Sequence, residues 1–163
     1  MANSRIKNIK SIIVLAFVVL FSACQTNVSQ QQGHTNFTDH QVISILLNKR
    51  PMRVEVVNTQ ASITQGLSDR TNIGSDGMLF FLPEQRIPTF WMKHMYFPLD
   101  LIWLNHTQIV DISYFVPAPS FSTPDSELPL YSPTMPANMV LEVPAGMSEK
   151  WHIKKGDALE IHP

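Results

Sequence analysis

Short hydrophobic segments separated by turn-forming residues make up most of the chain from residue 42 onward. They are rich in β-branched and aromatic residues, and glycine, proline or asparagine lies between them, as is typical of β-strands. Residues 53–57 (Arg-Val-Glu-Val-Val) alternate imperfectly, as a partly buried strand does. The segments that this pattern predicts as strands are 42–47, 52–58, 77–82, 89–93, 99–104, 109–116, 139–143 and 158–161. Residues 48–51 (Asn-Lys-Arg-Pro) between the first two predict a hairpin.

Two segments have a helical pattern instead. In residues 60–70, Ala61, Ile63 and Leu67 recur at about the helical period, and residues 145–152 form a second short candidate. Many short strands with one or two short helices predict a mainly β fold. We expect a compact antiparallel β-barrel or a jelly-roll-like sandwich.

A long proline-rich stretch interrupts the strand pattern. Residues 117–136 hold six of the 12 prolines in the chain. A connection of this length is uncommon inside a compact domain unless it has a role of its own. We expect a lid, a binding loop or a cover draped over the domain.

The N-terminus has a different pattern. Arg5, Lys7 and Lys10 form a basic start, and an uncharged, largely apolar run follows over residues 11–23. Such a run rises only about 20 Å as a helix, which is short of the roughly 30 Å hydrocarbon core. The pattern therefore favours a signal peptide over a permanent transmembrane helix.

The single cysteine of the chain follows this run at once. The sequence Phe21-Ser22-Ala23-Cys24 resembles the box of a bacterial lipoprotein signal, a large apolar residue and two small ones before Cys. The resemblance implies cleavage before Cys24 and attachment of acyl chains to it, which anchor the protein to a membrane. The alternatives are an uncleaved anchor and a secreted protein with an unused cysteine. Gln25, where an Asp favours retention at the inner membrane of such lipoproteins, indicates the outer membrane in an organism with two.

These patterns divide the chain into three parts: a signal peptide (1–23), a lipidated Cys24 with a flexible polar tether (24–41), and one β-rich domain (42–163). The 163 residues carry a formal net charge of −1. Loss of residues 1–23 removes three basic and no acidic side chains, so nine basic against 13 acidic ones leave −4. A mildly acidic protein argues against nucleic acid as a partner. The expected location is the bacterial cell envelope, with the domain outside the cytoplasm.

Several kinds of chemistry are excluded or lack a candidate. One cysteine rules out an internal disulfide framework and a CxxC redox pair. The histidines show no metal-ligand spacing, and glycine-rich phosphate loops and a Gly-x-Ser-x-Gly nucleophile motif are absent. We therefore predict no metal and no cofactor, and no catalytic residue is assigned.

Four charged residues in apolar surroundings are the candidate site. Lys93 and Asp100 flank a predicted reversal, Arg70 ends the first helix, and Glu142 interrupts an apolar strand, where a carboxylate normally has a partner. Either these charges form a structural ion-pair network, or Arg70 and Lys93 bind an anionic or polar ligand beside the two acids. Trp91 offers a stacking face for a sugar or peptide, although strand aromatics usually belong to the core.

From residue 54 to 161 the chain resembles the domain-of-unknown-function 192 family of bacteria and archaea. The residues that carry the resemblance are Gly66-Leu67 with Arg70, Gly77-Met78-Leu79-Phe80, Phe90-Trp91-Met92-Lys93, Pro98-Leu99-Asp100, Leu141-Glu142, Ala145-Gly146 and Gly156-Asp157. The resemblance implies a compact β-barrel or jelly-roll-like sandwich with small helices. It implies no activity, because the family as a whole has no established function.

Three functions follow as hypotheses. The first is a non-catalytic envelope module that binds a small ligand, a glycan or a protein partner. The second is a hydrolase with Asp100 and Glu142 as acid and base, a role that requires the two groups to lie together. The third is a structural accessory lipoprotein without a pocket.

Overall fold

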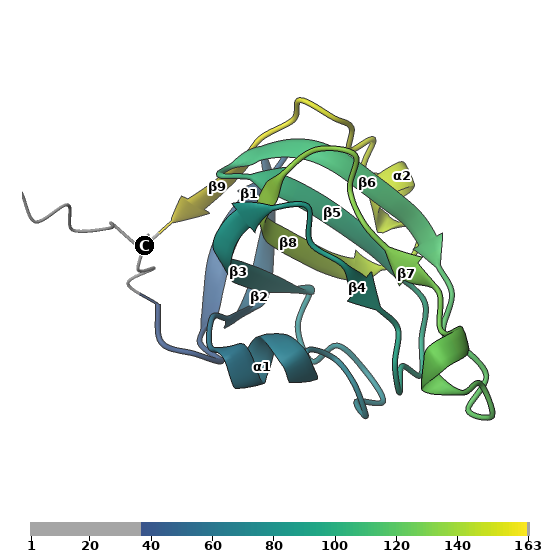
Figure 1. The fold of residues 1–163 in the computed structure, drawn as a ribbon. Coiled ribbons are helices and arrows are strands. Elements are labelled where there is room, and N and C mark those ends of the chain that lie inside the picture. Colours follow the sequence, from purple (N-terminus) through teal and green to yellow (C-terminus); the bar gives the residue numbers. More distant parts are fainter. Residues whose placement is uncertain (1–36, 163) are drawn as a thin grey trace, which may run out of the picture. The chain divides into compact units, whose positions relative to one another are not determined.

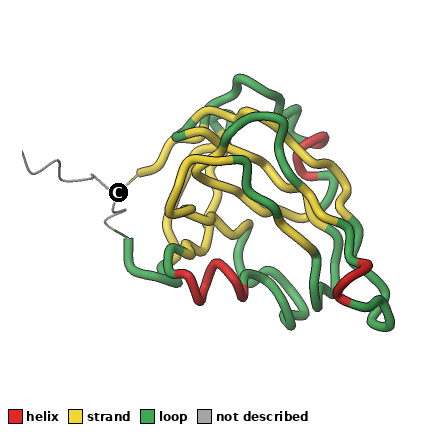
Figure 2. Tube along the Cα trace, in the orientation of Figure 1, coloured by secondary structure: helices red, strands yellow, loops and turns green. Residues whose placement is uncertain are grey.

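The computed structural model describes residues 37–162, which lie within one compact unit. The predicted signal peptide, Cys24 and most of the predicted tether lie outside the described residues. The strands are β1 (Val42–Leu47), β2 (Arg50–Val57), β3 (Gly77–Arg86), β4 (Phe90–Trp91), β5 (Leu99–Asn105), β6 (Gln108–Val116), β7 (Leu130–Tyr131), β8 (Ala137–Pro144) and β9 (Leu159–His162). The helices are α1 (Gln60–Gln65), α2 (Met147–Lys150) and a single 3₁₀ turn, η1 (Asp125–Glu127). Figure 1 shows the arrangement and Figure 2 the predominance of strands, which confirms the predicted mainly β class.

Seven strands form one strongly curled sheet in the order β6-β5-β8-β3-β2-β1-β9 (Figure 1). The two ends of the sheet approach each other, since Gln108 at the start of β6 bridges Ala158 just before β9. Leu159 N–H also donates to the Thr107 carbonyl oxygen at 2.8 Å. These bonds close one end of the curled sheet into a barrel, so the two sheet edges are partly protected there.

One strand pair differs from the predicted antiparallel arrangement. β2 and β3 are parallel, with Val54 opposite Gly77 and Val57 opposite Phe80. The connection between them contains α1, and parallel neighbours require such a crossover because a tight turn cannot join them. The hairpin predicted at residues 48–51 is confirmed, since β1 and β2 pair antiparallel around Asn48 and Lys49.

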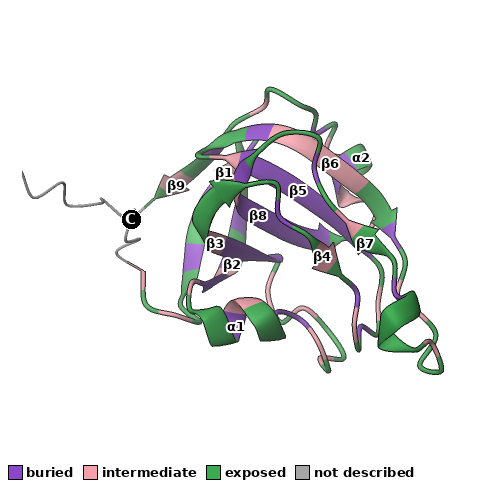
Figure 3. Cartoon of the chain, viewed as in Figure 1, coloured by how far each residue is buried: buried purple, intermediate pink, exposed green. Residues whose placement is uncertain are grey.

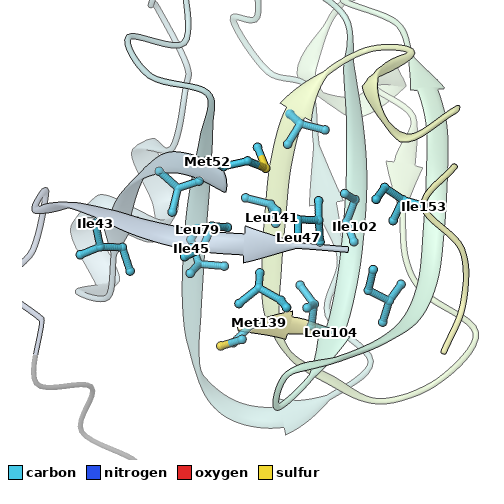
Figure 4. Close-up of a cluster of buried hydrophobic side chains, with 14 of the residues drawn as sticks. Ile43, Ile45, Leu47, Met52, Leu79, Ile102, Leu104, Met139, Leu141 and Ile153 are labelled. Atoms are coloured by element: carbon cyan, nitrogen blue, oxygen red, sulfur yellow. The ribbon is translucent and has the colours of Figure 1, made fainter. Parts of the chain in front are cut away.

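Alternating side chains divide the hydrophobic core into two clusters on opposite faces of the sheet. The first fills the inside of the curl and includes Ile45, Ile102 and Leu141 (Figure 4). The second lies on the other face, includes Phe80 and Trp103, and is covered by the chain segments outside the sheet. β5 and β8 are buried on both faces (Figure 3), which explains why they are almost continuously apolar.

The helix α1 is specified by local interactions. Thr59 and Ser62 form a capping box, in which each side chain binds the backbone N–H of the other. Asp39 Oδ1 accepts a further bond from Ser62 Oγ at 2.7 Å. At the C-terminal end Gly66 has φ +49°, and a Cβ there would lie 3.3 Å from the ring of Phe80. Glycine therefore lets the helix end close against β3.

The end of the predicted tether belongs to the folded unit. Phe37 packs on the first core cluster with its ring centroid 6.0 Å from that of Phe81. His40 Nδ1 lies 2.8 Å from Glu55 Oε1, and Asp39 binds the start of α1. Residues 37–41 therefore dock on the domain, which the polar composition of the tether did not indicate.

The proline-rich residues 117–136 form a cover. Their strand β7 pairs with β4, which lies earlier in the chain, in a two-stranded ribbon with Phe90 opposite Tyr131 and Trp91 opposite Leu130. Tyr131 packs on the second core cluster, whereas Leu130 is exposed. Of the three roles considered for this stretch, the structure shows the draped cover over the second cluster.

Candidate functional site

Arg70 is held by an acidic residue that the sequence analysis did not single out. Its guanidinium makes two bonds to Glu55 on β2, of 2.6 and 2.8 Å. The Arg70 bonds hold the pKa of Glu55 below its ordinary value, against the opposing effect of burial. Glu55 also contacts His40. Arg70 therefore joins the segment after α1 to β2. Its two terminal guanidinium nitrogens already bind the Glu55 carboxylate.

Lys93 binds the proline-rich cover. Its Nζ lies 2.6 Å from Asp125 Oδ2 in η1 and 5.5 Å from the ring centroid of Trp91. The Asp125 side chain is 57% exposed, so this ion pair is a surface contact. Sequence reasoning missed Glu55 and Asp125 because both partners lie far from the basic residue in the chain, without a local signal.

Asp100 is fully buried, and its carboxylate accepts hydrogen bonds from backbone N–H groups. Its two carboxylate oxygens accept bonds from the N–H groups of Phe115 (2.9 Å), Gly146 (3.1 Å) and Ser148 (2.9 Å). Phe115 has φ +50° and lies in the irregularity where β6 shifts its register against β5. Asp100 thus provides hydrogen-bond acceptors for backbone N–H groups in the bulged strand β6 and at the start of α2. This is a structural role.

Asp100 and Glu142 point to opposite faces of the sheet. Glu142 pairs with Leu101, a member of the second core cluster, while Asp100 pairs with Val143 of the first. Since neighbouring side chains in a strand alternate between faces, the sheet itself separates the two carboxyl groups. The predicted hydrolase pair is therefore wrong, because the two acids cannot act on one substrate.

The four predicted charges also do not form one network. Arg70 and Lys93 pair with Glu55 and Asp125, and Asp100 binds backbone N–H groups. No ion pair joins any two of Arg70, Lys93, Asp100 and Glu142 among residues 37–162. The structure thus corrects both the four-charge ion-pair network and the cleft in which all four meet.

Glu142 is the exception among these charges. It is only 6% exposed, and no hydrogen bond or ion pair reaches its carboxyl from the described part of the chain. Its neighbours across the strands are Met78 and Leu101. Burial in this apolar environment raises the pKa of Glu142 to about 8, so the group is mostly protonated at pH 7.

Glu142 lines a pocket of about 300 Å³. One wall comes from α1 and the residues after it, and another from β3. The third wall is the segment that contains β4. Gly66, Phe80, Phe90 and Trp91 are among the lining residues. Of the five predicted site residues, Trp91 and Glu142 are brought together here, while Arg70, Lys93 and Asp100 do not line it.

The aromatic wall of this pocket is firmly held. The rings of Phe80 and Phe90 meet edge to face with centroids 5.3 Å apart, and Phe90 meets Trp103 at 5.4 Å in the same manner. Trp91 is 45% exposed at the opening. A pocket that combines aromatic side chains, polar side chains such as Gln60 and Thr64, and one buried carboxyl has the general character of a small-molecule site.

Neither a membrane span nor a metal cluster is seen in the described part of the chain. No helix within residues 37–162 is long and apolar enough to cross a membrane. In the same range no three His, Cys, Asp or Glu residues are grouped so that they could hold a metal ion.

Comparison with known proteins identifies the fold but no activity. The model of the family DUF192, described as "Uncharacterized ACR", matches residues 43–161. A protein of unknown function from Novosphingobium aromaticivorans is 26% identical, with a TM-score of 0.64 over 77% of this chain and 89% of its own. A protein from Sinorhizobium meliloti, provisionally described as a transcription regulator, is 27% identical, with a TM-score of 0.65 over 77% of this chain and 97% of its own. No curated protein matches the chain significantly.

Proposed function

The chain belongs to the DUF192 family, and we propose that it is a lipid-anchored protein of the bacterial cell envelope that binds a small ligand without transforming it. The pocket that Glu142 lines supports the binding part of this proposal. A buried carboxyl without a partner costs stability, and a protein retains such a group most readily where a ligand uses it.

The absence of a second reactive group beside Glu142 favours binding over catalysis. Within the described pocket lining, the other titratable side chain is Arg86, and Ser68 has no adjacent base among the lining residues. General acid–base or nucleophilic catalysis requires two groups that meet at the reacting atoms. A single carboxyl in a pocket with aromatic and uncharged polar side chains is suited to recognition.

The envelope part rests on the N-terminal sequence. Cys24 follows a basic start and a short apolar run, and it lies outside the described residues. Lipid on Cys24 anchors the protein, and the residues before the domain give it reach from the membrane surface. The domain then meets its ligand outside the cytoplasm, at the outer membrane in an organism with two membranes.

Two variants test the binding site. We propose a thermal-shift screen of the purified protein against envelope sugars, peptides and small metabolites. Thr64→Trp places a large side chain at an exposed position of the pocket lining, and Thr71→Trp is the matched control at an exposed position outside it. A ligand of the pocket raises the melting temperature of the wild type and the control, but not that of Thr64→Trp. Equal shifts in all three proteins would exclude this pocket.

Lipidation is tested in cells. The full-length protein is expressed during growth with labelled palmitate, beside Cys24→Ser. We expect label in the membrane-bound wild type and none in the variant. An unlabelled wild type, or a variant labelled as strongly, would refute the anchor.

A further inference from the structure

Glu142 has no cation to neutralise it in its own pocket. Arg86 is the one basic residue in the described lining, and its β3 position pairs with Ala137. Ala137 lies five residues before Glu142 on β8, about 17 Å along an extended strand. Arg86 is exposed, so its charge is at the opening. Among residues 37–162, the buried Glu142 carboxyl therefore has no basic side chain paired with it.

The nearby basic groups are engaged elsewhere. Arg70 binds Glu55 and Lys93 binds Asp125. His94 Nδ1 lies 3.4 Å from Asp69 Oδ1. On the sheet face of Glu142, the paired residues Met78 and Leu101 are uncharged, and the lining residues from α1 carry no titratable side chain. A positive partner for Glu142 must therefore come from outside the pocket.

The pocket walls are chemically suited to such a partner. The rings of Phe80, Phe90 and Trp91 line it together with the thioethers of Met92 and Met95. Aromatic faces attract cations, and methionine side chains are polarisable. Trp91 already attracts one cation within the protein, since Lys93 Nζ lies over its ring.

We propose that the ligand of this pocket is a small organic cation, a primary or substituted ammonium on an apolar body, whose nitrogen pairs with the Glu142 carboxylate. The inference rests on the proposed small-ligand function and specifies its ligand class. The volume of about 300 Å³ is at the small end of the range for ligand sites, which suits a compact amine.

Binding of a cation changes the proton balance of the site. Without ligand the buried Glu142 carboxyl keeps its proton at neutral pH. When the ammonium group enters, the carboxyl loses that proton to the solvent and the resulting carboxylate pairs with the ammonium, which keeps all its own protons. Below about pH 8 each binding event therefore releases up to one proton, and affinity rises up to tenfold per pH unit towards pH 8.

The test uses 2-phenylethylamine as the probe and 2-phenylethanol as its neutral counterpart, measured by isothermal titration calorimetry with the purified protein. Glu142→Gln keeps the shape of the side chain and removes its charge. Glu84→Gln removes an exposed acid from the same strand that supplies part of the pocket, without touching the lining. Trp91→Leu removes a half-exposed ring from the wall. Thermal unfolding of each variant verifies that it is folded.

We expect the amine to bind the wild type and Glu84→Gln at pH 8, and at least tenfold more weakly at pH 6.5. Glu142→Gln weakens amine binding at least tenfold at pH 8, and Trp91→Leu weakens it severalfold. Calorimetry in two buffers of different ionisation enthalpy shows proton release on amine binding at pH 6.5 in the wild type and Glu84→Gln, and none in Glu142→Gln.

The outcomes separate this inference from the proposed function. If the alcohol binds as tightly as the amine, or if Glu142→Gln binds the amine as the wild type does, the organic-cation inference is wrong. The proposed small-ligand function is then still supported if the screen finds a compound that raises the melting temperature of the wild type but not that of Thr64→Trp. If neither the amine nor any compound of the thermal-shift screen binds the folded wild type, the organic-cation inference and the proposed small-ligand function are both refuted.

Discussion

Asp100 and Glu142 lie on directly adjoining strands, yet their carboxyl groups face opposite sides of the sheet. Asp100 is surrounded by backbone N–H donors, whereas Glu142 faces apolar side chains and a pocket. A buried carboxyl group therefore has a structural role on one face of the sheet and, in our proposal, a ligand-binding role on the other. The predictions below separate these two roles.

Replacement of Asp100 by Asn should destabilise the domain by about 2–3 kcal/mol. One oxygen becomes an NH₂ group, and a donor then faces the N–H of Phe115, Gly146 or Ser148, so at least one charge-assisted bond is lost in a buried place. Urea unfolding measures the change. Glu84→Gln is the exposed control and should stay within about 0.5 kcal/mol of the wild type. A wild-type midpoint for Asp100→Asn would contradict the structural role.

Glu142→Gln should stabilise the protein, and the gain should grow with pH. The pKa of Glu142 is raised from its ordinary 4.5 to about 8 in the folded state. The contribution of Glu142 to the stability of the wild type is therefore most favourable below pH 4.5 and falls as the pH rises towards 8, because folding keeps a proton that the unfolded chain has released.

The size of this effect follows from the same shift. Between pH 4 and pH 7 the contribution of Glu142 to the free energy of unfolding falls by about 3 kcal/mol in the wild type, and this contribution is absent from the glutamine variant. Denaturant unfolding of both proteins at pH 4, 6 and 8 measures the difference, with Glu84→Gln as a variant that should show no pH-dependent gain. A difference between wild type and Glu142→Gln that stays constant over this range would show that Glu142 ionises normally.

Arg70 and Glu55 should be energetically coupled. The two bonds between them are partly shielded from water, with Glu55 13% and Arg70 31% exposed. We expect a double-mutant cycle of Arg70→Met and Glu55→Gln to give a coupling of about 1 kcal/mol at low salt, which decreases when salt is added. If the stability changes of the two single variants are additive, the bonds between Arg70 and Glu55 do not stabilise the domain.

Gly77→Ala should destabilise the domain by about 2 kcal/mol or more. A Cβ at this position would lie 2.8 Å from the backbone oxygen of Glu142 and 3.1 Å from Leu141 Cδ1, so β3 and β8 would have to separate. Gly74→Asn is the control, because a Cβ there meets nothing within 4 Å and Asn tolerates the local φ of +78°. Thermal melting compares the two. If Gly77→Ala melts at the wild-type temperature, β3 and β8 can accommodate a Cβ at this position without loss of stability.

The pairing of charged groups shows where sequence reasoning stops. Arg70 binds a residue 15 positions earlier, and Lys93 binds one 32 positions later. A charge in an apolar surrounding indicates that a partner is needed, but it does not indicate which one, because the partner is chosen when distant segments meet. For Glu142 even the expectation of a charged partner is wrong among the described residues, since its strand neighbours are apolar.

What the sequence alone determined is the local structure and the class. The strand segments, the first hairpin and the mainly β fold follow from alternation, β-branched residues and turn signals, which act over a few neighbouring positions. The family resemblance rests on motifs that can be read directly in the chain, and the family model confirms it. The resemblance of residues 21–24 to a lipoprotein signal can also be read directly, and both the signal peptide and lipidation of Cys24 remain predictions.

Only the tertiary structure decided which residues share a face and a pocket. The register of β8 against β5 places Glu142 beside Leu101 and Asp100 beside Val143, so the two acids are separated by the sheet. The crossover through α1 makes β2 and β3 parallel and brings the end of that helix against Phe80, which builds one wall of the pocket. The hydrophobic pattern determines which face of each strand is buried, but it does not specify which distant strands become neighbours or which of their residues are paired.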